Sequence, residues 1–582
     1  MGKKKPKQKN QIIAKPSPVK QTTFYNYQEF KARNTFWLLI VAGLLMCLLL
    51  FSIFKNISYP LFWADESMTA MGTERVLEFG YPKVHDGKNV FYDLRHSNPA
   101  LGINEKDDAY VGGTGWGHYY YGVIGYKLAE LTDNLYSKTG IYRSSYAIAG
   151  LLGLGVFIIL ICKILPDPFS RYAFISLFLL FSLMSVTLAL LIREVRYYSL
   201  VFLLSSVILG AYCSFRLYRP FNKILLVVIL TLSLWLLFNT FAPVFFIMIA
   251  SIGLSESIVA IDQFRKTDLK RSVMYVLPVF LSLTLSLLAV YPLLLYFKTF
   301  EISQAMKEFN NYGEKYWENV SIAFRYLKNF ELLWLAIAFK VLLMIHFKQF
   351  IREKAALLRI SAFLTLFFII YLFAIARIPN FLYTRYIIYL QPVLSIIIIL
   401  DFFLILKYYS IQSTRLISVR MIIPFGILAG FIFYTLASNF KYIKGHAYEL
   451  IHVYKGPLDY TIPYINENYP APENLVIATN YEETSFMYYL KSRVIMGYVG
   501  NNLAQDSIVD PDIIAYRKIW GNHAHAFNGF VNRAIFEPVK FPVKDIPLNN
   551  IPELNFMPPF NHYFMTPMAG TDGEATFLHI KK

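Results

Sequence analysis

The chain has 582 residues, of which 56% are hydrophobic and 16% are charged. So apolar a composition excludes an ordinary soluble domain for the bulk of the chain and predicts a polytopic membrane protein. The formal net charge of +18 does not indicate a nucleic-acid partner, because the basic residues gather in short segments between apolar runs, where they set topology and attract membrane lipids. The cysteines, Cys47, Cys162 and Cys213, fall in or beside apolar runs and imply no disulfide framework.

The first 35 residues are polar and basic, with the run Lys3-Lys4-Lys5-Pro6-Lys7-Gln8-Lys9. A segment of this composition cannot bury enough apolar surface to fold, so we predict that residues 1–35 form a disordered cytoplasmic tail. No small-residue cleavage site follows the next apolar run, which favours an uncleaved first span over a signal peptide.

Apolar windows recur along residues 36–439 at a length near the roughly 20 residues that cross a bilayer, and they predict about eleven transmembrane helices. The windows fall at 36–55, 143–164, 171–192, 197–217, 224–239, 241–260, 272–297, 329–346, 357–376, 385–406 and 419–438. The segment 224–260 is too long for one span. It divides into two short spans at Asn239-Thr240-Phe241-Ala242-Pro243, because basic residues flank both of its ends and an even number of crossings must separate them.

The basic loops at 163–171, 348–359 and 407–420 are predicted to be cytoplasmic, together with the N-terminal tail. The first long loop, 56–142, and the C-terminal segment, 440–582, are then extracytoplasmic. These assignments predict a multi-pass protein of the cytoplasmic (inner) membrane.

An acidic pair opens the first external loop in the motif Trp63-Ala64-Asp65-Glu66. Ionisable groups at a membrane boundary are costly to keep unpaired and are candidates for function. Two roles are open for Asp65, and the spacing of the residues does not distinguish between them. It can cap a helix by accepting backbone N–H bonds from Met68 or Thr69, or it can act as a general base toward an attacking hydroxyl.

Arginines at the outer ends of spans oppose the usual charge bias. Arg193 and Arg196 bracket Glu194, and Arg377 and Arg385 bracket a short turn further along the chain. Each arginine can anchor a lipid headgroup, or pair with Glu194 where it lies close. Together, on the same side as the acidic pair, they favour a site that holds a lipid-linked phosphate through bidentate guanidinium contacts.

The segment 440–582 has a soluble pattern. Residues 474–479 and 493–496 are predicted strands, 482–490 is a predicted short helix, and the prolines between Glu537 and Pro567 favour irregular, extended chain. We therefore predict a small extracytoplasmic α/β domain.

These motifs resemble those of the GT-C glycosyltransferases, in particular the branch of protein O-mannosyltransferases and lipid A aminoarabinose transferases. The resemblance rests on Trp63-Ala64-Asp65-Glu66, on Glu194-Val195-Arg196-Tyr197-Tyr198, and on Thr384-Arg385-Tyr386 followed by Gln391-Pro392. It implies a GT-C fold for residues 36–439 and an inverting transfer of one sugar from a polyprenyl-phosphate carrier to an acceptor on the outer face of the membrane.

The resemblance also implies roles for single residues. Asp65 matches the catalytic aspartate of the family, and Glu66 matches its acidic neighbour. Arg196 and Arg385 match positions where the family places cations and aromatics around the carrier phosphate. The further candidate substrate-binding residues are Arg193, Glu194, Tyr197, Arg377, Tyr386 and His118. The donor partner would be a polyprenyl-phosphate-linked sugar within the membrane lipids, and the acceptor a lipid, protein or glycan.

The sequence departs from the family in two respects. Many relatives carry a Pro-Pro-Leu-Tyr-Tyr-like element where this chain reads Gly113-Thr114-Gly115-Trp116-Gly117-His118-Tyr119-Tyr120-Tyr121, so acceptor or sugar preference stays open. Oligosaccharyltransferases of the superfamily use a divalent metal held by acidic residues. Here no external Asp-x-Asp is evident, and His85, His96 and His118 are scattered. We expect no cofactor, and leave open a metal to which Glu194 contributes.

Two other classes of protein compete with the transferase. A transporter or lipid-linked sugar flippase also needs many helices and polar groups within the membrane, but such proteins tend to show repeated halves, and none is evident here. A noncatalytic scaffold for the C-terminal domain gives no reason for Asp65 and the outward arginines to occur together.

Overall fold

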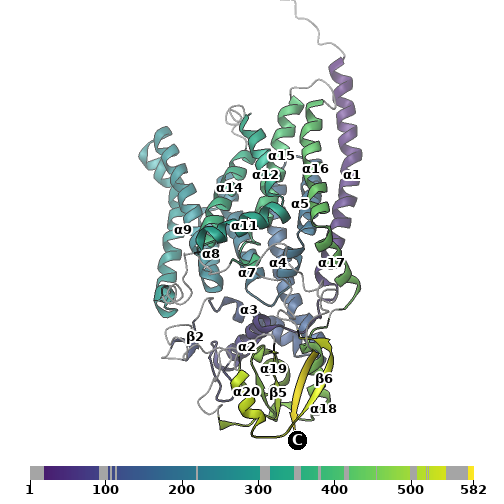
Figure 1. Ribbon diagram of the computed structural model, residues 1–582. Coiled ribbons are helices and arrows are strands. Elements are labelled where there is room, and N and C mark those ends of the chain that lie inside the picture. Colours follow the sequence, from purple (N-terminus) through teal and green to yellow (C-terminus); the bar gives the residue numbers. More distant parts are fainter. Residues whose placement is uncertain are drawn as a thin grey trace, which may run out of the picture.

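A helical bundle stands on a smaller unit of helices and strands in the computed structural model of the chain (Figure 1). The structure describes residues 19–90, 103–104, 108–111, 115–217, 221–301, 304, 315–345, 356–377, 382–411, 419–453, 455–497, 508–518, 521, 524–545 and 575–582. We call the end of the bundle that meets the smaller unit the sheet end.

Long apolar helices form the bundle. They are α1 (Val19–Phe54), α4 (Leu135–Ile164), α7 (Tyr198–Leu217), α8 (Lys223–Lys266), α9 (Leu269–Tyr296), α14 (Ala356–Ile375), α15 (Leu390–Ile411) and α16 (Val419–Ser438). Shorter members are α5 (Pro168–Met184), α6 (Val186–Leu191), α11 (Tyr316–Phe330), α12 (Leu333–Ile345) and α17 (Phe440–Ile451). Over the described ranges, 7 helices are long and apolar enough to cross a membrane, or 8 if the bent pair α16 and α17 is one span. The chain is a multi-pass membrane protein, and the number eleven stays a prediction. The prediction of a disordered tail is wrong for residues 19–35, because α1 begins at Val19.

Polar residues in the short connections begin several bundle helices. The Asn134 side chain accepts a hydrogen bond from the backbone of Ser137 at the start of α4, and Asp268 does the same at the start of α9. Asp167 caps α5, where Pro168 occupies the first turn. These side chains satisfy N–H groups that lack partners within the helix, so the helix starts are encoded locally.

α8 is a hairpin rather than one straight helix. Its backbone leaves helical geometry at Phe241 (φ −156°, ψ 94°), and Pro243 follows two residues later. Before the break, Asn239 lies against the loop that precedes α3 at the sheet end. After it, Glu256 accepts a 3.0 Å hydrogen bond from Arg216 in the last turn of α7, at the opposite end of the bundle. The chain therefore turns back at Phe241, as the sequence predicted from the flanking charges.

The smaller unit contains a five-stranded sheet in the order β4-β3-β5-β7-β6. The strands are β3 (Val476–Thr479), β4 (Arg493–Met496), β5 (Ile513–Ala515), β6 (Phe536–Lys544) and β7 (Ala575–Lys581), and the helices are α18 (Leu458–Asn468), α19 (Glu483–Leu490) and α20 (Ala524–Val531). β3 pairs in parallel with β4 and β5, whereas β7 runs antiparallel to β5 and β6. The predicted strand-helix-strand unit over 474–496 is confirmed.

The prediction of irregular chain after Glu537 is wrong for residues 536–544, which form the regular strand β6. β6 lies at the edge of the sheet. Pro538 and Pro542 are tolerated there, because an edge strand leaves some of its backbone N–H positions unpaired. The remainder of the predicted extended segment, 546–567, lies outside the described residues.

The first long loop packs onto the sheet. Its helices α2 (Ala64–Phe79) and α3 (Gly117–Ala129) lie between the bundle and the strands, and its described strands are the short pair β1 (Ile103–Asn104) and β2 (Ala109–Tyr110) (Figure 1). One hydrophobic cluster joins Phe62 of this loop with Ile477 and Phe486 of the α/β unit. The Phe62 backbone N–H donates to the Tyr489 hydroxyl at 3.0 Å, and the Ser485 hydroxyl donates to the Phe62 carbonyl at 2.9 Å. The loop and the α/β unit therefore share one core, and the domain boundary at residue 440 stays a prediction.

Candidate active site

The first turn of α2 presents Asp65 at the junction of bundle and sheet. The residue that precedes the helix is Trp63, and its side chain makes no capping bond. The Asp65 backbone carbonyl accepts a 3.1 Å hydrogen bond from the Thr69 hydroxyl. The Asp65 carboxylate makes ion pairs with Arg196 and Arg385 instead of capping the helix.

Asp65 meets two arginines that are far away in the sequence. Its Oδ2 atom lies 3.0 Å from Arg385 Nη1 and 3.4 Å from Arg196 Nη2. Arg196 Nη1 also donates to the Asp65 carbonyl at 3.1 Å. The exposed fractions of the side chains are 25% for Asp65, 12% for Arg196 and 16% for Arg385, so the cluster is sheltered and still reachable from solvent. One carboxylate between two guanidinium groups leaves an excess of one positive charge.

Several buried polar atoms beside this cluster have no hydrogen-bond partner within the described part of the chain. They are Nε of Arg196, Nε of Arg385 and the hydroxyl groups of Tyr198 and Tyr389. A buried donor without a partner costs about 1–3 kcal/mol, so such groups are kept where a ligand or water completes them. The unpaired guanidinium donors, with the excess positive charge, fit an anion with several oxygen acceptors.

Aromatic rings form one wall of the cluster. Phe241, at the break in α8, stacks on Tyr197 at 4.7 Å between ring centroids and lies nearly parallel to the Tyr386 ring at 6.2 Å. The guanidinium carbon of Arg385 lies 4.3 Å from the centre of the Tyr383 ring and 5.7 Å from that of Tyr386. Tyr197 and Tyr386 were predicted at the site, whereas Phe241 was not. The signal available for Phe241 was the helix break itself, which the sequence showed only as a boundary between spans.

His118 extends the aromatic wall. Its ring centroid lies 3.9 Å from that of Tyr119 and 6.0 Å from that of Tyr197, and the side chain is fully buried. Burial and the nearby charge of Arg196 hold the pKa of the His118 imidazole well below its usual value. The ring is therefore neutral near pH 7, and it packs against Tyr119 and Tyr197 without adding charge to the cluster.

Gly115 allows the external loop to dock on the α8 break. A Cβ atom at this position would lie 2.1 Å from the Asn239 carbonyl oxygen. We expect Gly115→Ala to destabilise the protein by about 1–3 kcal/mol through overpacking and to reduce activity by displacing Phe241. The measurement is the midpoint temperature of unfolding, determined by size-exclusion chromatography of heated samples in detergent. Gly155→Ala in α4 is the control, because no atom lies within 4 Å of its Cβ position. Equal midpoints for the two variants would contradict the docking role.

Glu66 was predicted to be catalytic, but the structure buries it behind the cluster, where 1% of the residue is exposed. Its carboxylate forms a two-bond ion pair with Arg143 of α4, at 2.8 and 2.5 Å, and accepts the Val195 backbone N–H at 3.1 Å. Val195 directly precedes Arg196. Glu66 therefore connects the helix of Asp65 to the segment of Arg196, which is a positioning role.

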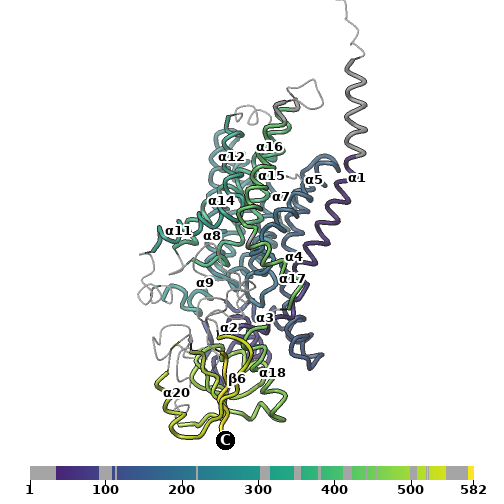
Figure 2. Tube along the Cα trace, turned by 45° about the vertical axis from the view of Figure 1, so that its right-hand side comes forward, coloured from purple at the N-terminus to yellow at the C-terminus, as the bar shows by residue number. Residues whose placement is uncertain are grey.

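Arg193 and Glu194, which precede Arg196 in the chain, are both buried. Arg193 is buried in an ion pair with Glu449 of α17, which also contacts His446 at 3.2 Å. α17 runs beside the lower end of α1 on the flank of the bundle (Figure 2). Glu194 is buried, and its carbonyl accepts the Arg196 N–H at 2.8 Å. The ion pair of Arg193 with Glu449 joins the arginine segment to α17.

Arg377 is exposed just after α14, and no contact joins its side chain to Asp65 in the ranges that the structure describes. Its predicted role in substrate binding stays a prediction.

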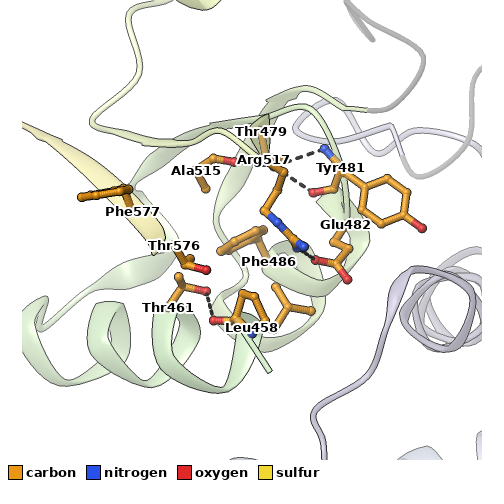
Figure 3. A pocket seen from close by; sticks show the side chains of 11 residues that line it. Leu458, Thr461, Thr479, Tyr481, Glu482, Phe486, Ala515, Arg517, Thr576 and Phe577 are labelled. Carbon is orange, nitrogen blue, oxygen red and sulfur yellow. Dashed lines mark hydrogen bonds and ion pairs between the residues drawn. The ribbon is translucent and has the colours of Figure 1, made fainter. Parts of the chain in front are cut away.

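A small pocket in the α/β unit lies at the carboxyl ends of β3 and β5 (Figure 3). Arg517 extends into it and pairs with Glu482, at 2.5 Å, and with Asp545. Burial raises the pKa of Glu482 to about 7. Glu482 has a left-handed backbone (φ 63°) directly before α19. Because Arg517 fills much of the pocket, we assign the cluster to holding the turn that aims α19 at α2.

The residues around Asp65 do not fit a divalent cation. Its carboxylate faces guanidinium groups, and among the described residues no group of three His, Cys, Asp or Glu side chains lies close enough to hold a metal ion. Hard cations take several oxygen ligands. The expectation of no cofactor, and the metal site to which Glu194 would contribute, both stay predictions.

The helical bundle and its appended α/β unit define a membrane protein with the GT-C fold. Among solved structures, the chain is similar to the archaeal oligosaccharyltransferase AglB from Archaeoglobus fulgidus, in complex with an inhibitory peptide and a dolichol-phosphate, at 11% identity and a TM-score of 0.51 over 81% of this chain and 65% of that one. At this identity the likeness shows a shared fold.

Two structures of ArnT from Cupriavidus metallidurans also match, each at 14% identity. The form bound to undecaprenyl phosphate aligns with a TM-score of 0.46 over 93% of this chain and 97% of that one, and the apo form with 0.47 over 89% and 97%. No protein-family model and no curated protein matches the sequence.

Proposed function

We propose that the protein is an inverting glycosyltransferase that moves a sugar from a polyprenyl-phosphate carrier to an acceptor on the outer face of the cytoplasmic membrane. The observation that carries the proposal is the contact of Asp65 with Arg196 and Arg385 at 3.4 and 3.0 Å. In the proposed roles, a base and two phosphate-binding cations share one sheltered site. The GT-C fold, which the dolichol-phosphate-bound AglB structure shares, supports a lipid-linked donor.

The chemistry requires groups on opposite sides of the anomeric carbon. Asp65 accepts the proton of an acceptor hydroxyl as its oxygen attacks that carbon. Arg196 and Arg385 stabilise the negative charge that develops on the departing phosphate. Phosphate needs no general acid to leave, and a single displacement inverts the configuration of the sugar. Tyr197 and Tyr386, whose rings lie nearly parallel to Phe241, flank Arg196 and Arg385.

Charge distribution supports the proposed sidedness. Basic residues such as Arg216 and Lys266 end helices at the end of the bundle opposite to the sheet. Positive charge in short loops marks the cytoplasmic side. The sheet end, with Asp65 and the α/β unit, would then face away from the cytosol. An acceptor that is a lipid, a protein or a glycan could approach there.

Arg385→Gln is expected to weaken the binding of decaprenyl phosphate by about 10- to 100-fold, since a hydrogen bond to a charged group contributes about 1.5–3 kcal/mol. The measurement is a titration of the purified protein in nanodiscs. Arg533→Gln is the control, because Arg533 is exposed in the α/β unit and meets only Asp510, at 3.5 Å, among its ionic partners in the described residues. Unchanged affinity in Arg385→Gln would argue against the phosphate role.

The reaction itself is tested by mass spectrometry of surface glycans and glycolipids from cells with and without the gene. Loss of one linkage, restored by the native gene and not by a variant at Asp65, is the expected result. An unchanged set of glycans and glycolipids in the deleted strain would oppose the transferase.

A further inference from the structure

Asp65 contacts the same two arginines that are proposed to bind the carrier phosphate. The Asp65 carboxylate occupies guanidinium groups that a carrier phosphate would also use, at 3.0 Å from Arg385 and 3.4 Å from Arg196. An ionised Asp65 is therefore a competitor of the phosphate. We propose that loss of a proton from Asp65 after sugar transfer drives release of the polyprenyl phosphate product. The inference rests on the proposed function and adds a step to it.

Charge balance at the site supports this step. A sugar-linked phosphodiester donor carries one negative charge, so donor and ionised Asp65 together match the two guanidinium groups. During transfer, the bond between the acceptor oxygen and the anomeric carbon forms, and the bond between that carbon and the phosphate oxygen breaks with its electron pair on the phosphate. The acceptor proton goes to Asp65. The phosphate monoester gains one negative charge as Asp65 loses one, so the site stays neutral.

Solvent access determines the fate of this proton. Asp65 has 25% of its side chain exposed, so its proton can pass to water. The ionised carboxylate then returns toward Arg385, and the site holds three negative charges against two positive ones. Coulomb repulsion at this separation weakens the hold on the phosphate. The buried Nε atoms of Arg196 and Arg385 lack hydrogen-bond partners in the described ranges. Their N–H groups are therefore free to bind the phosphate of the next lipid-linked sugar.

Two other ionisable groups of the described residues near Asp65 are held by their own surroundings. Glu66 is committed to Arg143 at 2.8 and 2.5 Å, and His118 is kept neutral by burial and by Arg196. Asp65 is the described carboxylate that contacts both arginines of the phosphate site and also reaches solvent.

The experiment measures binding of two probes to the full chain in nanodiscs at pH 8. Decaprenyl phosphate is a monoester that carries close to two negative charges above its second pKa of about 6, and decaprenyl methyl phosphate is a diester that carries one. Asp65→Asn mimics the protonated side chain. We expect it to bind the monoester about tenfold more tightly than the unsubstituted protein and the diester about threefold more tightly, because the repulsion removed scales with the charge of the probe.

Glu74→Gln is the matched control. It removes one negative charge from the same helix, at a residue that pairs with Lys491 at 2.6 Å, and we expect it to change neither affinity. Asp65→Ala removes the charge without introducing an amide. Like Asp65→Asn, it should bind both probes more tightly than the unsubstituted protein, with the larger gain for the monoester. Thermal midpoints confirm that each variant is folded.

Three results would overturn the inference. If the unsubstituted protein binds the monoester and Asp65→Asn binds it no more tightly, the release step fails while the transferase proposal stands. An equal gain for both probes excludes repulsion between charges as the cause. If the unsubstituted protein binds neither probe, the proposed carrier and the release step fail together.

Discussion

Asp65→Asn is expected to lower the rate of sugar transfer by about 10²- to 10⁴-fold, the usual contribution of a general base. The amide has nearly the same shape as the carboxylate and can still contact Arg385, but it cannot accept the proton of the acceptor. The measurement is the initial rate of transfer to membrane acceptors from cells that lack the gene, with labelled lipid-linked donor. Expression and thermal midpoint should match those of the native protein.

Glu74→Gln again provides the control on the same helix, and its rate should be unchanged. A rate within about threefold of native for Asp65→Asn would exclude general-base catalysis by Asp65, since that factor is below the range for general bases. The site would then serve phosphate binding alone, which the affinity measurements detect separately.

Glu66→Ala is expected to destabilise the protein by about 3–5 kcal/mol, because it leaves the buried Arg143 guanidinium without its counter-ion. Arg143 also donates to the carbonyls of Ile57 and Pro60, at 3.0 and 2.6 Å, so it cannot leave the interior without breaking those bonds. The measurement is the thermal or denaturant midpoint in detergent. Activity should fall as well, since Glu66 holds the segment that carries Arg196.

Asp262→Ala is the comparison for this prediction. It breaks an exposed pair with Lys266, at 2.5 Å with side chains 63% and 52% exposed, and such surface pairs contribute about 0–1 kcal/mol. The double variant Glu66→Leu with Arg143→Leu should recover part of the stability, because no charge is then buried alone. If Glu66→Ala and Asp262→Ala have similar effects, Glu66 is not the counter-ion that positions the site.

Local sequence patterns predicted the parts of this protein that depend on periodicity and composition. The apolar windows fall on helices, the hairpin in α8 follows from the charges that flank it, and β3, α19 and β4 match their predicted ranges closely. Solvation by lipid or water acts on each segment separately, so these features are readable without knowledge of neighbours.

The candidate site was predictable in part. Asp65, Arg196 and Arg385 were placed on one side of the membrane by charge bias and by family resemblance, and the structure brings the three together. Phe241 was missed because its role depends on a helix break that packs against a distant loop.

What the sequence by itself determined is therefore the membrane class, the order of the helices and the three charged residues of the site. Only the tertiary structure decided which charges meet at the candidate site and which pair elsewhere. Glu66 pairs with Arg143, 77 residues away, and Arg193 pairs with Glu449, 256 residues away. The physical reason is that every arginine and carboxylate at the sheet end is attracted to every opposite charge there, and only the packing of the helices selects which pairs come into contact.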